Sequence, residues 1–253
     1  RCLDAVEKVV KRIMDEEINI CGSGTASECW FGGKLRQTEP NCDAMETCVT
    51  FSWMQLNERL LEITGTPVYA GNIEKSIFNA LFASMKRDGS EIAKYLPLEG
   101  FRMGAIGQCG MPLHCCSANA PRAFAMIPRY VYLTRSGAVD VNLLVPSSAE
   151  VKVGKNVARL TMLTGYPQDG NSEITLECKG KPAFAMRVRI PEWAECADVR
   201  VNGVPVGDVV AGGYTVIDRI WNNVDKVSVS FEMTPWLVML GNYQAIVRGP
   251  ITL

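Results

Sequence analysis

The hydrophobic pattern of the chain changes its period once, near Tyr130, and this change constrains the fold more than any other feature. Before it, apolar residues recur every three or four positions, as on the buried face of a helix. After it, short runs alternate between apolar and polar residues, as in half-buried strands. The sequence therefore predicts an α+β chain, with a helical domain over residues 1–130 and a β-strand domain over residues 131–253.

Four helices are expected in the first part. The first opens the chain, and its apolar stripe comprises Leu3, Val6, Val9, Val10, Ile13 and Met14. The other three are expected over residues 43–64, 67–85 and 118–127. Gly65 and Pro67 end the second helix, and Pro128 lies just beyond the fourth.

Eight β-rich runs follow, separated by Gly, Asn, Asp and Pro: AVDVNLLV, ARLTMLTGY, SEITLECKG, AFAMRVRIP, DVRVNGVPV, YTVIDR, KVSVSFEM and YQAIVRG. Many short strands at this spacing are typical of an antiparallel β-sandwich. Three tryptophans in this part, Trp193, Trp221 and Trp236, are expected in the sandwich core rather than in a sugar site.

Composition excludes several classes of protein. Of the 253 residues, 47% are apolar and 21% are charged, which is ordinary for a globular chain. With a net charge of -1, the chain lacks the excess of basic residues expected of a protein that binds nucleic acid or an anionic membrane. No apolar run is long enough for a membrane-spanning helix. A small or neutral partner is favoured. Both ends interrupt a regular pattern, and the first residues do not have the pattern of a signal peptide, so we expect a piece of a longer protein.

Histidine and cysteine counts narrow the chemistry. The one histidine, His114, excludes an imidazole-rich metal site within this chain, and any Ser-His-Asp triad would have to use it. Eight of the ten cysteines lie in residues 1–116. Such clustering in a chain of this size favours metal ligation or reduced core thiols over a disulfide scaffold, and with it a reducing, cytoplasmic compartment.

Two short motifs could form a metal site: Glu46-Thr47-Cys48 and the vicinal pair Cys115-Cys116. One carboxylate and three thiolates suit a tetrahedral zinc ion. However, residues i and i+2 of a helix do not share a face, so Glu46 and Cys48 could converge only at an irregular helix start. The alternative is that these cysteines pack as small buried hydrophobes, and spacing alone leaves both readings open.

A third motif is SECWFGG, in which Glu28 lies beside Trp30 and Phe31 in a glycine-rich loop. Aromatic rings beside a carboxylate occur in sugar sites, where the carboxyl group serves as a general acid. By itself, a glutamate in a loop is more commonly a solvated surface group.

Several motifs, taken in order, carry a resemblance over nearly the whole chain: SECWFGG, METCVTFSWMQLNERLLEITG, YAGNIEKSIFNAL, YLPLEG, HCCSANAPRAFAMIPR, FAMRVRIPEW, VRVNG, GYTVIDRIW and VRGP. Together they resemble glycoside hydrolase family 127, the β-L-arabinofuranosidase family. The resemblance implies the C-terminal part of an α/α toroid of helical hairpins, followed by a β-sandwich.

The resemblance also implies residue roles. Zinc would be bound by Glu46, Cys48, Cys115 and Cys116, with Cys115 as the nucleophile. The acid/base would be Glu28, with Glu39 as the second choice because the spacing from Glu28 to Glu46 is slightly long. Apart from the resemblance, Cys109 lies close enough in sequence to Cys115 and Cys116 to be a rival ligand, and His114 is expected to pack or hydrogen-bond locally rather than act on substrate.

The implied activity is a retaining glycoside hydrolase that releases terminal β-L-arabinofuranose, or a similar sugar, from plant glycans. The family toroid is longer than the helical part here, so this chain alone is expected to be inactive or very weak. Two alternatives come from other classes. One is a noncatalytic carbohydrate-binding or structural module with a structural Cys3Glu zinc site. The other, a cysteine hydrolase of peptides, is disfavoured because only His114 could serve as its base.

Overall fold

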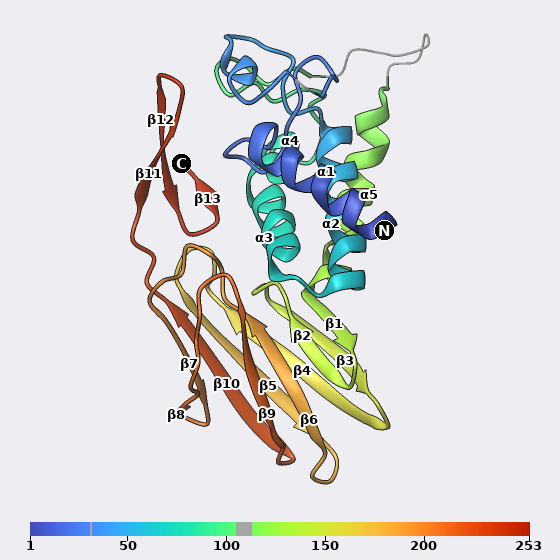
Figure 1. The fold of residues 1–253 in the computed structure, drawn as a ribbon, viewed down its shortest axis with the longest axis vertical. Coiled ribbons are helices and arrows are strands. Elements are labelled where there is room, and N and C mark those ends of the chain that lie inside the picture. Colours follow the sequence, from blue (N-terminus) through green and yellow to red (C-terminus); the bar gives the residue numbers. More distant parts are fainter. Residues whose placement is uncertain (31, 105–112) are drawn as a thin grey trace. The chain divides into compact units, whose positions relative to one another are not determined.

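The structure is a computed structural model and describes residues 1–30, 32–104 and 113–253 (Figure 1). Helices come first and strands follow, so the predicted α+β class is confirmed. The chain divides into two compact units, each built from separate stretches of sequence. The helical unit comprises residues 1–59, 72–126 and 235–253, and the β unit comprises residues 60–71 and 127–234.

The helical segments are α1 (Cys2–Glu16), a short 3-10 helix (Arg36–Thr38), α2 (Thr47–Thr64), α3 (Pro67–Ser76), a π-helix (Ile77–Leu81), α4 (Phe82–Ser84) and α5 (Cys115–Val131). A three-stranded sheet of β11 (Trp236–Leu240), β12 (Tyr243–Arg248) and β13 (Ile251–Thr252) completes the helical unit. Within the described ranges, no helix has the length and apolar character needed to cross a bilayer.

Two helix boundaries differ from those predicted. The second helix begins at Thr47 rather than at residue 43, because Ala44 pairs with another segment and Met45 has a left-handed backbone: the Leu96 N–H donates to the Ala44 carbonyl over 2.9 Å. The fourth helix begins at Cys115 rather than at residue 118 and runs past Pro128 to Val131. A proline removes only one N–H donor, and α5 continues for less than a turn beyond it.

The third helix, predicted as one element, contains a π-helical turn at Ile77–Leu81. This turn presents Asn79 to β13 of the same unit. The Asn79 amide donates to the Pro250 carbonyl over 2.8 Å and accepts from the Thr252 N–H over 2.8 Å. The side chain therefore pairs with β13 as a neighbouring strand would.

The apolar stripe predicted for α1 is unevenly covered. Val10 is buried at 1% exposure, whereas Val6 and Val9 on the same stripe are 40% and 60% exposed. Leu3, Ile13 and Met14 are half-buried, so other described residues cover the stripe only in part.

The loop after α1 is fixed by polar contacts inside the helical unit. The Ser23 hydroxyl lies 2.8 Å from the Thr50 hydroxyl of α2, and the Ser76 hydroxyl donates to the Gly22 carbonyl over 2.6 Å. Gly22 has φ +75°, and a Cβ there would lie 2.6 Å from the Ser76 nitrogen. Only glycine allows this approach, which positions the segment that carries Glu28.

The β unit holds the remaining ten strands: β1 (Tyr132–Arg135), β2 (Ala138–Val141), β3 (Ser147–Val153), β4 (Asn156–Thr164), β5 (Asn171–Cys178), β6 (Ala183–Arg189), β7 (Ala197–Val201), β8 (Val204–Pro205), β9 (Tyr214–Ile220) and β10 (Val224–Phe231). They form a six-stranded sheet in the order β3-β4-β5-β10-β7-β8 and a four-stranded sheet in the order β1-β2-β6-β9. The four-stranded sheet is mixed rather than antiparallel, because β2 and β6 run parallel.

One face of the six-stranded sheet is buried. Leu160, Ile174 and Val227 are all at 0% exposure on neighbouring strands, and the residues between them along each strand are more exposed. This is the alternation that predicted the strands.

The three tryptophans differ in their surroundings. Trp221 is fully buried in the β unit and donates to the Phe184 carbonyl over 2.9 Å, as expected for core. Trp193 is half-buried and stacks on Tyr166 with ring centres 6.3 Å apart. Trp236 is half-buried on β11, which belongs to the helical unit, so its predicted place in the core of the β domain is wrong.

Candidate active site

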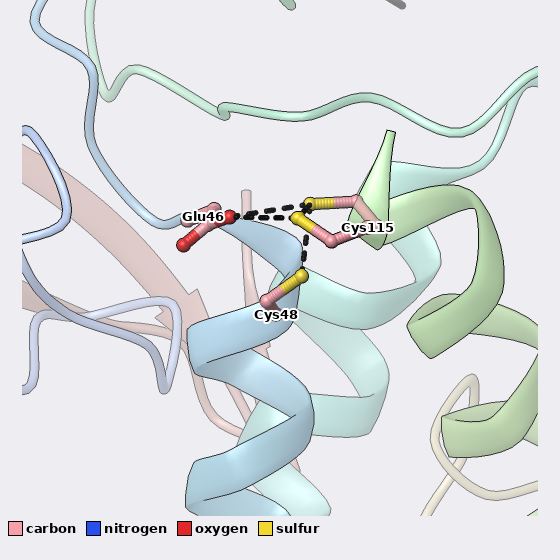
Figure 2. A group of neighbouring side chains, drawn as sticks. Glu46, Cys48 and Cys115 are labelled. Carbon is pink, nitrogen blue, oxygen red and sulfur yellow. Dashed lines mark hydrogen bonds between the residues drawn. The ribbon is translucent and has the colours of Figure 1, made fainter. Parts of the chain in front are cut away.

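Glu46, Cys48, Cys115 and Cys116 converge in the helical unit, although about 70 residues separate the two motifs (Figure 2). We call them the Cys3Glu cluster; their ligand atoms all lie within 4.8 Å of one another. Sγ of Cys48 is 3.3 Å from Sγ of Cys116, and Oε1 of Glu46 is 3.4 Å from Sγ of Cys115 and 3.6 Å from Sγ of Cys116.

These separations suit a tetrahedral metal ion. Zinc–ligand bonds of about 2.0–2.3 Å place the ligand atoms of a tetrahedron roughly 3.3–3.8 Å apart. The donor set, one carboxylate oxygen and three sulfurs, is also one that zinc accepts. Within the described residues, the cluster can therefore hold a metal ion of this size.

An irregular helix start brings Glu46 and Cys48 together, as the spacing requires. Glu46 precedes α2, and Cys48 lies in its first turn. Met45, just before Glu46, has φ +50°, a left-handed conformation that a methionine seldom adopts. This turn points the Glu46 carboxylate back toward the sulfurs.

All three cysteines lie at helix N-termini. Cys48 is the second residue of α2, and Cys115 and Cys116 are the first two residues of α5. Unpaired N–H groups and the helix dipole make such ends favourable for anions. The two helices therefore help to hold the sulfurs as thiolates.

The thiols do not ionise equally. The hydrogen bond from Cys116, followed by that from the Asn119 amide, lowers the pKa of Cys48 to about 7. Burial, followed by the neighbouring Cys48 and Glu46, raises the pKa of Cys115 to about 11. The hydrogen bond to Cys48 together with burial raises the pKa of Cys116 as well. Several anions in one small space oppose one another, so a cation is needed to hold all four groups ionised.

Glu28 is held by two neighbouring side chains. Its Oε1 accepts a hydrogen bond from the Tyr95 hydroxyl over 2.5 Å and lies 2.9 Å from Nζ of Lys94. Because both contacts favour the carboxylate, Tyr95 first and Lys94 second, the pKa of Glu28 lies below its usual value. The side chain is 48% exposed, so Glu28 remains open to solvent.

One segment connects Glu28 to the cluster. The Lys94 carbonyl accepts from the Thr47 N–H over 3.0 Å and lies 3.9 Å from Sγ of Cys116, while the Ala93 carbonyl accepts from the Thr47 hydroxyl over 2.8 Å. Lys94, which contacts Glu28, is thus fixed to Thr47, the residue between Glu46 and Cys48. Sequence reasoning missed Lys94 and Tyr95, which precede and open the YLPLEG motif but carry no signal of their own.

Glu39 lies elsewhere in the unit. It is exposed, follows the short 3-10 helix, and contributes, after burial, to the raised pKa of Cys42. It does not belong to the Cys3Glu cluster.

His114 is buried at 4% exposure, and neither ring nitrogen has a hydrogen-bond partner among the described residues. Its carbonyl accepts from the Ser117 N–H over 3.0 Å and so begins α5. The expected packing role fits this burial, whereas no local hydrogen bond of the ring is found there. Cys109, the rival ligand, lies outside the described residues.

The fold and the cluster together define an α+β protein with a candidate metal centre of one carboxylate and three thiols. Residues 1–129 match the family described as "Beta-L-arabinofuranosidase, GH127 catalytic domain", and residues 138–233 match "Beta-L-arabinofuranosidase, GH127 middle domain". The chain belongs to glycoside hydrolase family 127, the β-L-arabinofuranosidase family.

Individual relatives agree with this family. The chain is 23% identical, over 98% of its length, to a non-reducing end β-L-arabinofuranosidase of Bifidobacterium longum subsp. longum. It is similar in structure to a GH127 β-L-arabinofuranosidase from Geobacillus stearothermophilus T6, with TM-score 0.84, 26% identity and 96% of the chain covered. A second GH127 β-arabinofuranosidase structure gives TM-score 0.86, 29% identity and 99% coverage. The chain spans 41%, 41% and 43% of the lengths of these three relatives.

Proposed function

We propose that the protein is a retaining glycoside hydrolase that releases terminal β-L-arabinofuranose, or a closely similar sugar, from plant-derived glycans. The observation that carries the proposal is the Cys3Glu cluster, formed at two helix N-termini in a chain of family 127. The substrate follows from the names of the relatives, which are β-L-arabinofuranosidases.

Glu46, Cys48, Cys115 and Cys116 would hold a zinc ion. When bound, the ion supplies the positive charge that keeps the three sulfurs ionised at neutral pH. The ligand separations and the donor set support this assignment.

Cys115 is the proposed nucleophile. Its thiolate attacks the anomeric carbon, so that a C–S bond forms as the bond from that carbon to the leaving oxygen breaks. Glu28, as the acid, gives its proton to the leaving oxygen. In the second step the Glu28 carboxylate takes a proton from water, the water oxygen displaces the sulfur from the anomeric carbon, and the Cys115 thiolate is restored.

The surroundings of Glu28 suit these two steps unequally. Tyr95 and Lys94 favour the carboxylate, which is the form that acts as base in the second step. To act as acid in the first step, Glu28 must be protonated, and its contact with the Lys94 ammonium then loses its ionic character. Tyr95 can serve both forms, because a hydroxyl both donates and accepts hydrogen bonds.

The finer architecture is part of the same proposal. Residues 1–130 would form the C-terminal part of an α/α-toroid catalytic domain. Of residues 131–253, expected as a β-sandwich domain, strands β1–β10 would form the sandwich, because β11–β13 group with the helical unit. Helices with the Cys3Glu cluster support the first assignment, and the one-sided burial of the six-stranded sheet supports the second.

The test is substitution of Cys115 and Cys48 by serine in a protein of the full family length, assayed on an aryl β-L-arabinofuranoside. A nucleophile and a ligand differ in their effects. Because both cysteines are proposed ligands, both variants should lose metal and stability. Cys115→Ser should also abolish turnover in molecules that keep their metal and fold, whereas Cys48→Ser molecules that keep them should retain some turnover. Equal activity of Cys115→Ser and the unsubstituted enzyme would refute the proposal.

The same pair of variants distinguishes the noncatalytic alternative. In a structural zinc site Cys115 and Cys48 are equivalent ligands, so both variants should lose metal and stability to a similar degree, and the unsubstituted protein should show no turnover.

A further inference from the structure

One amide group contacts the cluster from outside it. Nδ2 of Asn119, on α5, donates to Sγ of Cys48, on α2, over 3.1 Å. Asn119 lies one turn beyond Cys115 and Cys116 on α5, so it faces the same direction as those cysteines. Its side chain therefore links the two helices whose N-termini carry the three sulfurs.

The orientation of this amide is fixed by an arginine. NH1 of Arg122 donates to Oδ1 of Asn119 over 3.0 Å, so the amide oxygen is occupied and the NH2 group faces the sulfur. The Arg122 guanidinium lies 4.8 Å from the ring centre of Phe51, which is buried on α2. Arg122 thus holds the amide and also rests on the helix that carries Cys48.

We propose that Asn119 is a positioning residue of the metal centre, which presents an N–H to the Cys48 sulfur and commits that sulfur to metal ligation, with Arg122 fixing the amide. This proposal rests on the metal centre of the proposed function. An N–H donated to a thiolate withdraws charge from it, which orients the ligand and lowers its nucleophilicity. Cys48 is therefore the sulfur set for ligation, distinct in role from the nucleophile Cys115.

The experiment measures metal binding to the 253-residue chain, without an activity assay. Zn²⁺ affinity is measured by competition with a chromophoric chelator, and the sulfur-to-metal charge-transfer band is recorded with Co²⁺ in place of Zn²⁺. Asn119→Leu removes the donor at similar size, and Asn119→Asp keeps the pairing with Arg122 but turns an oxygen toward the sulfur. Asn72→Leu is the matched control, since it removes an amide donated to Asn57 over 2.8 Å in the same unit.

Partners that orient metal ligands contribute about 10–100-fold to affinity. Asn119→Leu should therefore bind Zn²⁺ about 10–100-fold more weakly and shift the Co²⁺ charge-transfer band to longer wavelength, because the sulfur electrons become easier to remove. Asn119→Asp should bind at least as weakly, and Asn72→Leu should match the unsubstituted chain in both measurements.

Two results would overturn the proposal. If the unsubstituted chain binds one ion and Asn119→Leu matches it in affinity and band position, Asn119 does not position Cys48, and the proposed function stands. If the unsubstituted chain binds no ion even with added Zn²⁺, this inference fails together with the metal centre itself.

Discussion

Asn79 fastens β13 within the helical unit, and removing its amide should release that strand. The amide donates to the carbonyls of Lys75 and Pro250 and accepts from the Thr252 N–H, each over 2.8 Å. The side chain is buried at 8% exposure. In Asn79→Ala, the Pro250 carbonyl and the Thr252 N–H both lose their partner.

The cost follows from those two groups. A buried polar group left without a partner costs about 1–3 kcal/mol. Pro250 is buried and Thr252 is half-buried, so the lower part of that range applies, and Asn79→Ala should lower the unfolding free energy of the helical unit by about 2–4 kcal/mol. Asn72→Ala removes a single, half-buried amide contact to Asn57 and should cost about 1 kcal/mol.

Urea unfolding gives the free energies, and hydrogen exchange of peptides that cover residues 250–253 gives the local effect. The Thr252 amide should be protected in the unsubstituted chain and in Asn72→Ala, and should exchange rapidly in Asn79→Ala. An Asn79→Ala variant within 0.5 kcal/mol of the unsubstituted chain, as a rough limit for a neutral surface change, with unchanged exchange, would refute the reasoning.

Asn79→Asp tests in which direction the stability should change with pH. A carboxylate at this buried position faces two carbonyl oxygens, so its folded-state pKa should rise above the unfolded value. The protonated form can still donate to a carbonyl, so the deficit relative to the unsubstituted chain should be small at acidic pH and should grow as the pH rises through the raised pKa.

Three further predictions concern other contacts. Tyr95→Phe removes the strongest contact that stabilises the Glu28 carboxylate, so an NMR titration should show the pKa of Glu28 moving up toward its usual value. Because this contact contributes only while Glu28 is ionised, its stabilising effect should be present at neutral pH and lost as the pH falls through that pKa. An unchanged or lower pKa of Glu28 would contradict the assignment. In the β unit, Asp140 is fully buried and accepts two hydrogen bonds of 2.5 Å from Arg187. Arg187→Met should therefore lower the unfolding free energy by about 3–5 kcal/mol in chemical denaturation. A loss within about 1 kcal/mol, the value of a surface ion pair, would show that the pair does not stabilise the β unit. On α1, Val10→Ala should lower the unfolding free energy by about 1.5 kcal/mol, at about 0.8 kcal/mol for each buried carbon group removed. Val9→Ala, at a 60% exposed position, should lower it by less than about 0.5 kcal/mol. Equal losses of stability in thermal unfolding would mean that Val9 is as well covered as Val10.

Sequence reasoning found most of the strands but missed β1, β3 and β11, and β3 was missed although it alternates. Leu160 and Met162 on β4 are buried beside more exposed neighbours, which is the period-two signal. On β11 the exposed positions, Leu237 and Met239, are themselves apolar, so the sequence shows no alternation there. On β11, therefore, period-two alternation gives no signal, because both faces of the strand carry apolar residues.

Some residues of the candidate site could likewise be predicted from the sequence, and others could not. The four cluster residues were identified through two motifs and a family resemblance, whereas spacing alone left them open. What spacing could not reveal is the left-handed turn at Met45, which lets residues i and i+2 converge. Lys94, Tyr95 and Asn119 were missed because contacts between distant segments position them, and a single sequence does not display such contacts.

The most direct test of the metal centre is the zinc-to-protein ratio of the purified 253-residue chain, measured by elemental mass spectrometry after loosely bound metal is removed. The ligand separations in the Cys3Glu cluster predict a ratio near one, and a ratio near zero for Cys116→Ser, since Cys116 is the buried sulfur within 3.9 Å of both other thiols. A ratio near zero for the unsubstituted chain, even with added Zn²⁺, would contradict the assignment of Glu46, Cys48, Cys115 and Cys116 as a zinc site in this chain.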